Sequence, residues 1–188
     1  MKTLKFLTAV CFTAISLGAS SCTPTQSVRV SSLSPDQILA SCVHNQVNAY
    51  RKSKGSAALS GHPGLNKLAL QHSEYMRKNR GTFGLYGKNV THMGSEGRAL
   101  AAMRIYNFIN SSENVAAAMK GASNSQSAAT LVKLWTNSPE HEAEMKASSY
   151  THTGIGIVTD ADGTMFATQI FGTLTQNQLA TRERFNSF

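Results

Sequence analysis

Cysteine is scarce in this sequence, and its cysteines do not form a disulfide framework. The 188 residues contain only three, at Cys11, Cys22 and Cys42. The first lies in an N-terminal export segment, and the second follows that segment directly and is the expected lipidation site. Cys42 is then left without a partner. We expect it to be a free, poorly reactive residue on the buried face of a helix.

Long apolar runs, dense basic runs and common hydrolase motifs are also missing. No segment after the N-terminus is apolar enough to span a bilayer. The formal net charge is +8, but the basic residues are scattered, so nucleic acid is not an expected partner. Anionic lipid, teichoic or polysaccharide surfaces would attract such a chain. The sequence has no Ser-His-Asp order, Gly-x-Ser-x-Gly elbow, His-Glu-x-x-His or phosphate loop.

The N-terminus has the three parts of an export signal. A basic region at 1–5 precedes an apolar run at 6–17, and small residues stand directly before Cys22. We predict that residues 1–21 are a signal peptide, and that Cys22 is lipidated and anchors the protein to a membrane of the cell envelope. The alternative is ordinary cleavage nearby, which leaves a secreted protein. Residues 22–33 are polar and aperiodic, which predicts a flexible tether.

Helical periodicity covers much of the chain that follows. Ser34-Pro35-Asp36-Gln37 combines a cap, a first-turn proline and a capping-box glutamine, which predicts a helix start. Gly55 marks the predicted end of that helix. The further expected helices cover 65–76 and 95–110, a short segment opening at Ser112, the stretch 128–136, and a short helix capped by Ser138 that has His141 in its first turn.

A β-hairpin is expected near the C-terminus. Residues 151–158 and 164–171 alternate small or polar with apolar residues around a turn at 159–163. Gly154 and Gly156 share one strand face, where they allow a helix to approach closely. Helices followed by a hairpin indicate an α+β layered domain over 34–173, with a polar extension at 174–188.

The stretch from Ile38 to Gly172 resembles the CAP superfamily of SCP-like extracellular domains, in its bacterial YkwD-like branch. The resemblance rests on an ordered set of motifs: Gly64–Ala69, His92 in a Gly-rich stretch, Glu113-Asn114-Val115-Ala116, Trp135–His141, Tyr150–Gly156 and Thr168–Gly172. It implies a three-layer α-β-α sandwich with a central, mostly antiparallel sheet.

The same resemblance implies a cavity lined by His92, Glu113 and His141. Ser138 stands where eukaryotic members usually have a further glutamate. If the three side chains converge, they could hold a divalent cation such as zinc, although only weakly, because Ser138 removes one anionic partner. The alternative is a hydrogen-bonded polar network that requires no cofactor.

Several other side chains are expected to have structural roles and not to bind a ligand. Trp135 is expected to anchor the core. His72 lies on the apolar stripe of a predicted helix, so we expect it to be a buried histidine that is hydrogen-bonded within the core. His152 begins a strand and is expected on the sheet surface. Asp160 and Asp162 are explained by the hairpin turn and not by a calcium loop.

These observations favour an exported binding module of the cell envelope that engages a wall polymer, a lipid or an envelope protein. The alternative is an envelope hydrolase in which Glu113 acts as general base with the cavity histidines, with or without a metal.

Overall fold

The computed structural model describes residues 33–81 and 90–175. The expected signal peptide, the lipidation site Cys22, the tether up to residue 32 and the extension from residue 176 lie outside the described residues. The described helices are α1 (Pro35–Ser53), α2 (Pro63–Lys78), α3 (Ser95–Tyr106), α4 (Asn124–Thr136) and α5 (Pro139–Lys146). The strands are β1 (Ser60–Gly61), β2 (Asn110–Met119), β3 (His152–Thr159) and β4 (Thr164–Thr173).

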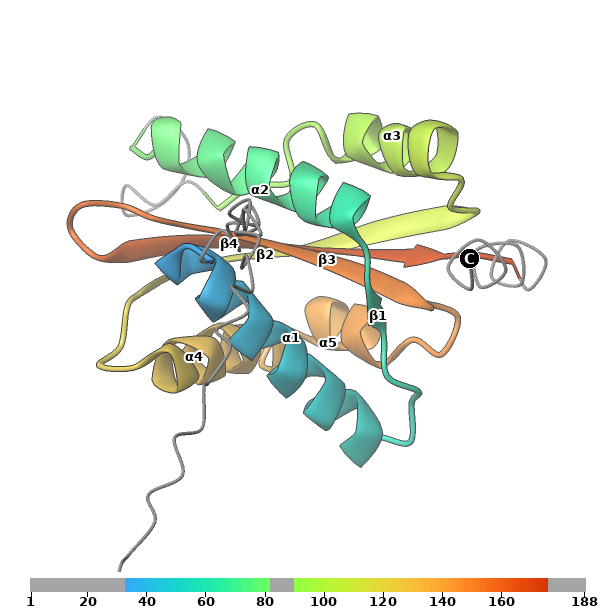
Figure 1. Cartoon of the computed structure of the whole chain (residues 1–188), viewed down its shortest axis with the longest axis horizontal. Helices are drawn as coiled ribbons and strands as arrows, with labels where there is room; N and C mark the ends of the chain where they lie inside the picture. The colour runs from blue at the N-terminus through green and yellow to red at the C-terminus, as the bar shows by residue number, and fades with distance from the viewer. Residues whose placement is uncertain (1–32, 82–89, 176–188) are drawn as a thin grey trace, which may run out of the picture. The chain divides into compact units, whose positions relative to one another are not determined.

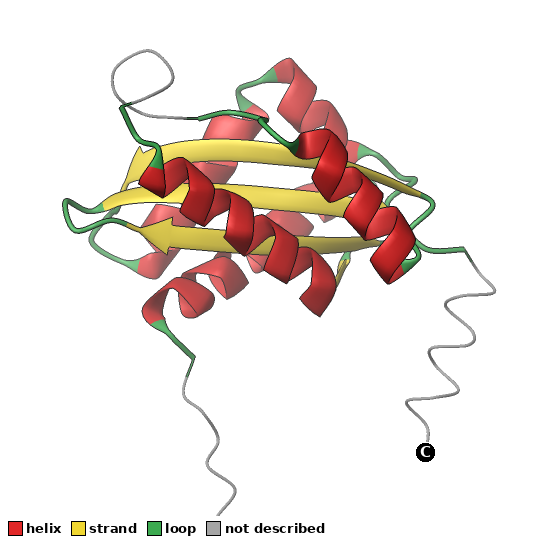
Figure 2. Cartoon of the chain, turned by 90° about the horizontal axis from the view of Figure 1, so that it is seen from above, coloured by secondary structure: helices red, strands yellow, loops and turns green. Residues whose placement is uncertain are grey.

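The strands form one sheet in the order β1-β3-β4-β2. The short β1 runs parallel to β3, and the two longer pairings, β3 with β4 and β2 with β4, are antiparallel. Helices α2 and α3 cover one face, and α1, α4 and α5 cover the other (Figure 1). The view from above also has helices in front of the sheet and behind it (Figure 2). The expected α-β-α sandwich with a mostly antiparallel sheet is confirmed.

The close approach predicted at two glycines of β3 is present. A Cβ atom at Gly154 would lie 2.1 Å from the carbonyl carbon of Leu65. A Cβ at Gly156 would lie 2.1 Å from the backbone nitrogen of Leu70. The main chain of α2 therefore rests directly on β3, and any larger side chain at these positions would push the helix away.

The larger core lies between the sheet and the layer of α1, α4 and α5. Trp135 is fully buried in it, as predicted. On α1 the buried stripe consists of Leu39, Val43, Val47 and Arg51. Cys42 is a free cysteine, as expected, but it is only partly buried, because the stripe passes through the neighbouring Val43.

The helix expected from Ser112 is wrong, because this residue lies in strand β2. All ten residues of β2 pair with β4, from Asn110 opposite Thr173 to Met119 opposite Thr164. The alanines of β2 favour a helix locally, but this long pairing outweighs their propensity. The preceding helix α3 also ends earlier than expected, because Asn107 adopts a left-handed conformation with φ 61°.

The expectation that His152 lies on the sheet surface is also wrong. His152 is 5% exposed, since β1 pairs alongside it. Its ring packs 5.8 Å from the ring of Phe108 and 6.0 Å from that of His62. An apolar and aromatic contact therefore closes this end of the sheet.

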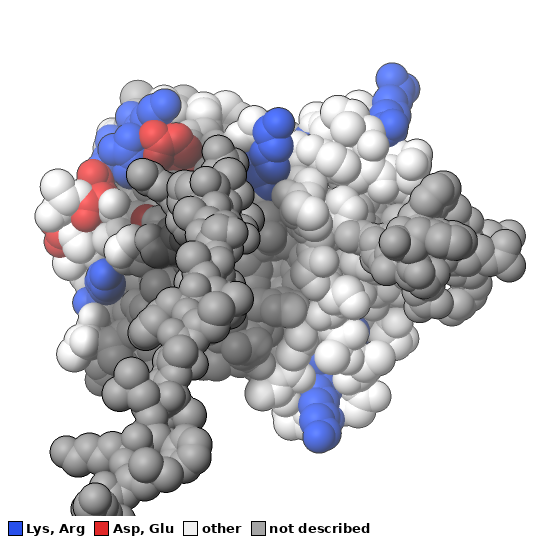
Figure 3. Space-filling view, in the orientation of Figure 1, with Lys and Arg blue, Asp and Glu red and all other residues white. Residues whose placement is uncertain are grey.

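The charges on the face in Figure 3 are dispersed, and its basic side chains do not gather in one patch. Two acidic residues of the hairpin turn are paired with one arginine: Arg80 contacts Asp160 at 2.6 Å and Asp162 at 2.8 Å. This pairing agrees with a structural role for the turn. Within the described ranges, no helix has the length and apolar character needed to cross a membrane.

Candidate functional site

The candidate site is built around the carboxylate of Glu113. Glu113 lies on β2 opposite Ile170, and 7% of its side chain is exposed. Arg98 of α3 donates from Nε to one carboxylate oxygen at 2.7 Å and from Nη2 to the other at 2.6 Å. This two-point, charge-assisted contact fastens α3 to the edge strand of the sheet.

His92, just before α3, makes the third contact with this carboxylate. Its Nδ1 lies 3.0 Å from Oε1 of Glu113, and its side chain is half exposed. Burial acts to raise the pKa of Glu113, but hydrogen bonds from His92 and Arg98 outweigh it, and the pKa is lowered overall. Because the ionised carboxylate can only accept, Nδ1 of His92 donates the hydrogen in this contact.

Local backbone geometry explains how the loop before α3 reaches Glu113. Gly94 is the N-cap of α3 and has φ 77°, a conformation that glycine adopts without strain. It lets the chain turn around Arg98, whose Nη1 donates to the carbonyl of Met93 at 2.9 Å. On the other side, Nε2 of His72 donates to the carbonyl of Thr91 at 2.6 Å.

His72 is a core histidine, as predicted. It is 2% exposed, and burial lowers its pKa. Its Nδ1 has no hydrogen-bond partner among the residues described, so only Nε2 is satisfied. Through Thr91, this buried ring positions the residue next to it in sequence, His92.

His141 approaches the same place from α5. Its ring centre lies 6.0 Å from that of His92, near enough for one water or ligand atom to contact both rings. Burial and the neighbouring His92 lower the pKa of His141, so its imidazole is neutral at pH 7. Nδ2 of Asn114 donates to the carbonyl of His141 at 2.9 Å and thereby ties β2 to α5.

The cavity at this site has a volume of about 380 Å³. It is lined by residues of the loop before α3, of α3, of β2 and of β4, most of them of polar type: His92, Ser95, Glu96, Arg98, Ala99, Ser111, Ser112, Glu113 and Ile170. Neither His141 nor Ser138 is among these lining residues. Ser138 is the N-cap of α5, but its side chain makes no capping hydrogen bond. The predicted cap position is therefore correct, and the predicted use of its hydroxyl is not.

The geometry does not favour the divalent cation predicted for His92, Glu113 and His141. Both oxygens of Glu113 are held by Arg98, whose positive charge would repel a cation. Nδ1 of His92 is engaged as well. Across the two described ranges, no group of three or more His, Cys, Asp or Glu side chains could hold a metal ion. A zinc site here stays a prediction that would require Arg98 to move.

Sequence reasoning missed two residues that shape this site. Arg98 was one of many scattered basic residues, and no spacing connects it to Glu113. Asn114 was noted only as part of a motif, although it is fully buried and its Oδ1 has no partner in the part of the chain described. Asn114 follows Glu113 directly, and a buried polar residue in a strand indicates a role in a site. This signal could be used only if residues 110–119 had been predicted as a strand.

The family model named CAP, the cysteine-rich secretory protein family, matches residues 44–171. The chain belongs to this family. No curated protein matched the sequence.

Solved structures share the fold. An outer surface protein from Borrelia burgdorferi superposes with a TM-score of 0.58 at 18% identity, over 74% of this chain and 95% of that one. A cysteine-rich secretory protein from Staphylococcus aureus has a TM-score of 0.56 at 20% identity, over 76% of this chain and 41% of that one. An extracellular SCP-domain protein from Bacillus anthracis has a TM-score of 0.54 at 23% identity, over 76% and 45%. This chain thus spans less than half the length of the last two proteins.

Proposed function

We propose that this chain is an exported binding module of the cell envelope, and that the cavity at Glu113 takes a polar ligand. Support for export comes from the signal-like N-terminus and from the extracellular or outer-surface descriptions of the similar structures. The hydroxyl of Ser95 and the half-exposed ring of His92 line the cavity and suit a ligand rich in hydroxyl and amide groups, such as a wall polymer.

The observation that carries this proposal is the state of the Glu113 carboxylate. A general base needs an accessible oxygen and a pKa close to the working pH. Glu113 is almost buried, Arg98 contacts both oxygens, and its pKa is lowered. It is therefore better suited to hold the cavity in shape than to remove a proton, which favours binding over hydrolysis.

Cys22 supplies the anchor in this proposal. A diacylglycerol on its sulfur would provide two acyl chains, which suffice for stable anchoring where one chain is marginal. In the native host, Cys22→Ser should abolish metabolic lipid labelling and membrane retention, whereas Cys42→Ser should change neither. A wild-type protein that is entirely soluble and begins at another residue would disprove the anchor without affecting the cavity.

The binding proposal is tested with purified full-length chain and soluble muropeptides, the disaccharide-peptide fragments of the wall. We expect saturable binding by calorimetry and unchanged muropeptides by mass spectrometry. His92→Ala should weaken binding about tenfold through the loss of one directed hydrogen bond. Lys52→Gln, on exposed α1 surface in the other layer, is the control.

The hydrolase alternative makes the opposite prediction in the same experiment. Cleavage of the muropeptides that is lost in both Glu113→Gln and His141→Ala would establish an enzyme and overturn the binding module. A third outcome is that muropeptides do not bind, whereas anionic lipid vesicles bind in a His92-dependent manner. The ligand would then be a lipid headgroup and not a wall polymer.

A further inference from the structure

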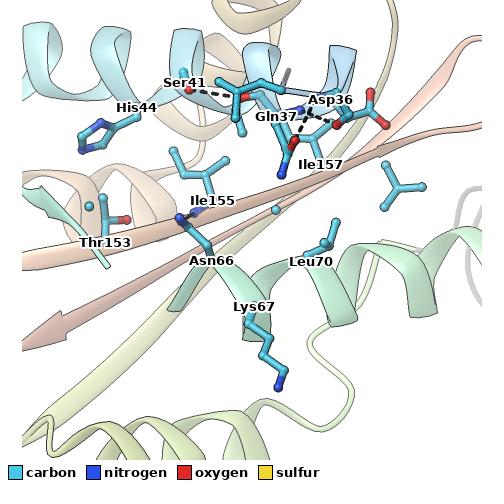
Figure 4. Close-up of a pocket in the computed structure, with 16 residues that line it drawn as sticks. Asp36, Gln37, Ser41, His44, Asn66, Lys67, Leu70, Thr153, Ile155 and Ile157 are labelled. Carbon is cyan, nitrogen blue, oxygen red and sulfur yellow. Dashed lines mark hydrogen bonds between the residues drawn. The ribbon is translucent and has the colours of Figure 1, made fainter. Parts of the chain in front are cut away.

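A second cavity lies at the opposite edge of the sheet from Glu113. It is a groove of about 660 Å³ between α1 and α2, with residues 153–158 of β3 at its base. Figure 4 shows α1 and α2 on either side of the strand. We call this cavity the edge groove. It shares no lining residue with the cavity at Glu113.

Among the strands of the described ranges, none pairs with most of the outer edge of β3. β1 pairs only with His152 and Thr153, so the sheet ends at β3 beyond these two residues. In an antiparallel ladder, alternate residues bond the neighbouring strand and the others point outward. Thr153 accepts from His62 of the β1 segment, which sets the outward-facing series at 153, 155, 157 and 159.

Side chains satisfy the outward N–H groups on both sides of Ile157. Asn66 of α2 accepts from the N–H of Ile155 at 2.9 Å through Oδ1. Asp36 of α1 accepts from the N–H of Thr159 at 3.0 Å through Oδ2. Between them, the outward N–H and C=O of Ile157 have no hydrogen-bond partner among the residues that the structure describes. Ile157 is only 2% exposed, so side chains of the groove wall must move aside before a further strand can reach these two groups. An unpaired donor and acceptor on one residue are what a further strand would bind.

We propose that the edge groove binds an extended segment of a second polypeptide, which adds as a short strand beside Ile157. The two capped positions, Ile155 and Thr159, are four residues apart and limit the paired length to about 13 Å. A peptide backbone can satisfy both free groups of Ile157. An acyl chain fills apolar space but offers neither a donor nor an acceptor, so it fits this groove less well.

The groove walls and their charge define the chemistry of this segment. Side chains of an added strand point alternately toward the two helices. On α2 they meet Leu70, an apolar side chain that is 47% exposed, and on α1 they meet Gln37 and Ser41. Lys67 at the rim forms no salt bridge with a described residue. The matching segment alternates apolar with small polar β-branched residues and carries an acidic residue at one end.

The flanking helices argue against a second copy of this chain as the occupant. For two β3 edges to pair, the α1 and α2 helices of each copy would have to occupy the same space beside the new strand pair. A single extended segment without its own covering helices avoids this clash. Peptide addition to a sheet edge therefore fits better than dimerisation through β3.

The probe is a fluorescein-labelled hexapeptide, Glu-Val-Thr-Val-Thr-Val, together with a set that varies each position, titrated against the full-length chain by fluorescence anisotropy. We expect saturable binding that falls at least about tenfold when the amides facing β3 are N-methylated. Leu70→Glu should weaken binding to a similar extent. Leu134→Glu is the matched control, because Leu134 is 43% exposed on α4, away from the groove.

Amide exchange supplies the readout that locates the strand. In the free protein the Ile157 amide should exchange faster than those of Gly156 and Val158, and the peptide should slow it selectively. His92→Ala should leave peptide binding unchanged, so failure of the cavity proposal can be told apart from failure of this one. The proposal is overturned if no member of the set binds, if N-methylation or Leu70→Glu has no effect, or if palmitate binds in a Leu70-dependent manner without protecting Ile157.

Discussion

The two edges of the sheet carry cavities that differ in what they leave unsatisfied. At the β2 edge, charged side chains satisfy one another, since Arg98 and His92 both bond Glu113. At the β3 edge, the backbone N–H and C=O of Ile157 have no hydrogen-bond partner in the part of the chain that the structure describes. The first edge offers a shaped polar surface, whereas the second offers main-chain hydrogen bonds. The two proposals differ accordingly, with side chains recognising a polar ligand at one edge and the backbone recognising a peptide at the other.

The largest expected effect tests the wall of the edge groove. Gly156→Ala would place a Cβ 2.1 Å from the backbone nitrogen of Leu70, so α2 must move away from β3. We expect the free energy of unfolding to fall by about 3 kcal/mol or more, at the upper end for overpacking. Urea denaturation followed by circular dichroism measures this change.

The control for this substitution lies on the helix beside the other cavity. A Cβ at Gly97 of α3 has no neighbour within 4 Å. Gly97→Ala should therefore be neutral or stabilise the chain by up to about 1 kcal/mol, since alanine favours a helix. If Gly156→Ala lowered the free energy of unfolding no more than Gly97→Ala does, the main chain of α2 would not be packed tightly against β3.

The second prediction tests the charge cluster at the β2 edge. Glu113→Gln leaves Arg98, whose side chain is 14% exposed, without its anion. We expect a loss of about 2 kcal/mol in the free energy of unfolding, less than for a fully buried pair because Arg98 keeps some contact with water. Glu96→Gln, at an exposed position lining the same cavity, should change it by less than about 0.5 kcal/mol.

A double-mutant cycle separates the ion pair from other effects at Glu113. Arg98→Met removes the cation, so Glu113→Gln should cost less in that background than in the wild type. Additive losses in denaturation midpoints would mean that Glu113 and Arg98 do not stabilise one another, which would contradict the geometry of the site.

The third prediction concerns acid. Burial lowers the pKa of His141 and of His72, so below about pH 6.5 the unfolded chain binds protons that the folded chain does not. Stability therefore falls as the pH drops through this range. Glu113, also lowered, adds a further loss below about pH 4.5.

Chemical denaturation at a series of pH values measures this profile. His141→Gln should flatten the part below pH 6.5, and Glu113→Gln should flatten only the part below pH 4.5. A profile for His141→Gln parallel to that of the wild type would mean that this imidazole is not held neutral by the fold.

The sequence predicted the elements whose residues carry their own local signals. The β3–β4 hairpin was found because alternation and turn residues agree, and the start of α1 because Ser34, Pro35 and Gln37 form a capping box. Strand β2 was missed because its alanines favour a helix and only the pairing with β4 makes it a strand. Arg98 was missed for a related reason: its role depends on a contact between α3 and β2 that no local pattern encodes.

The smallest expected effect compares the serines at the N-caps of α1 and α5. Ser34, which lines the edge groove, accepts from the N–H of Gln37 and completes a capping box, whereas the hydroxyl of Ser138 makes no capping bond. Ser34→Ala should therefore lower the free energy of unfolding by about 1 kcal/mol. Ser138→Ala should lower it by less than about 0.5 kcal/mol, because no hydrogen bond of the fold is lost. Thermal unfolding of both variants distinguishes the two caps, and a larger loss for Ser138→Ala would mean that its hydroxyl does cap α5 in solution.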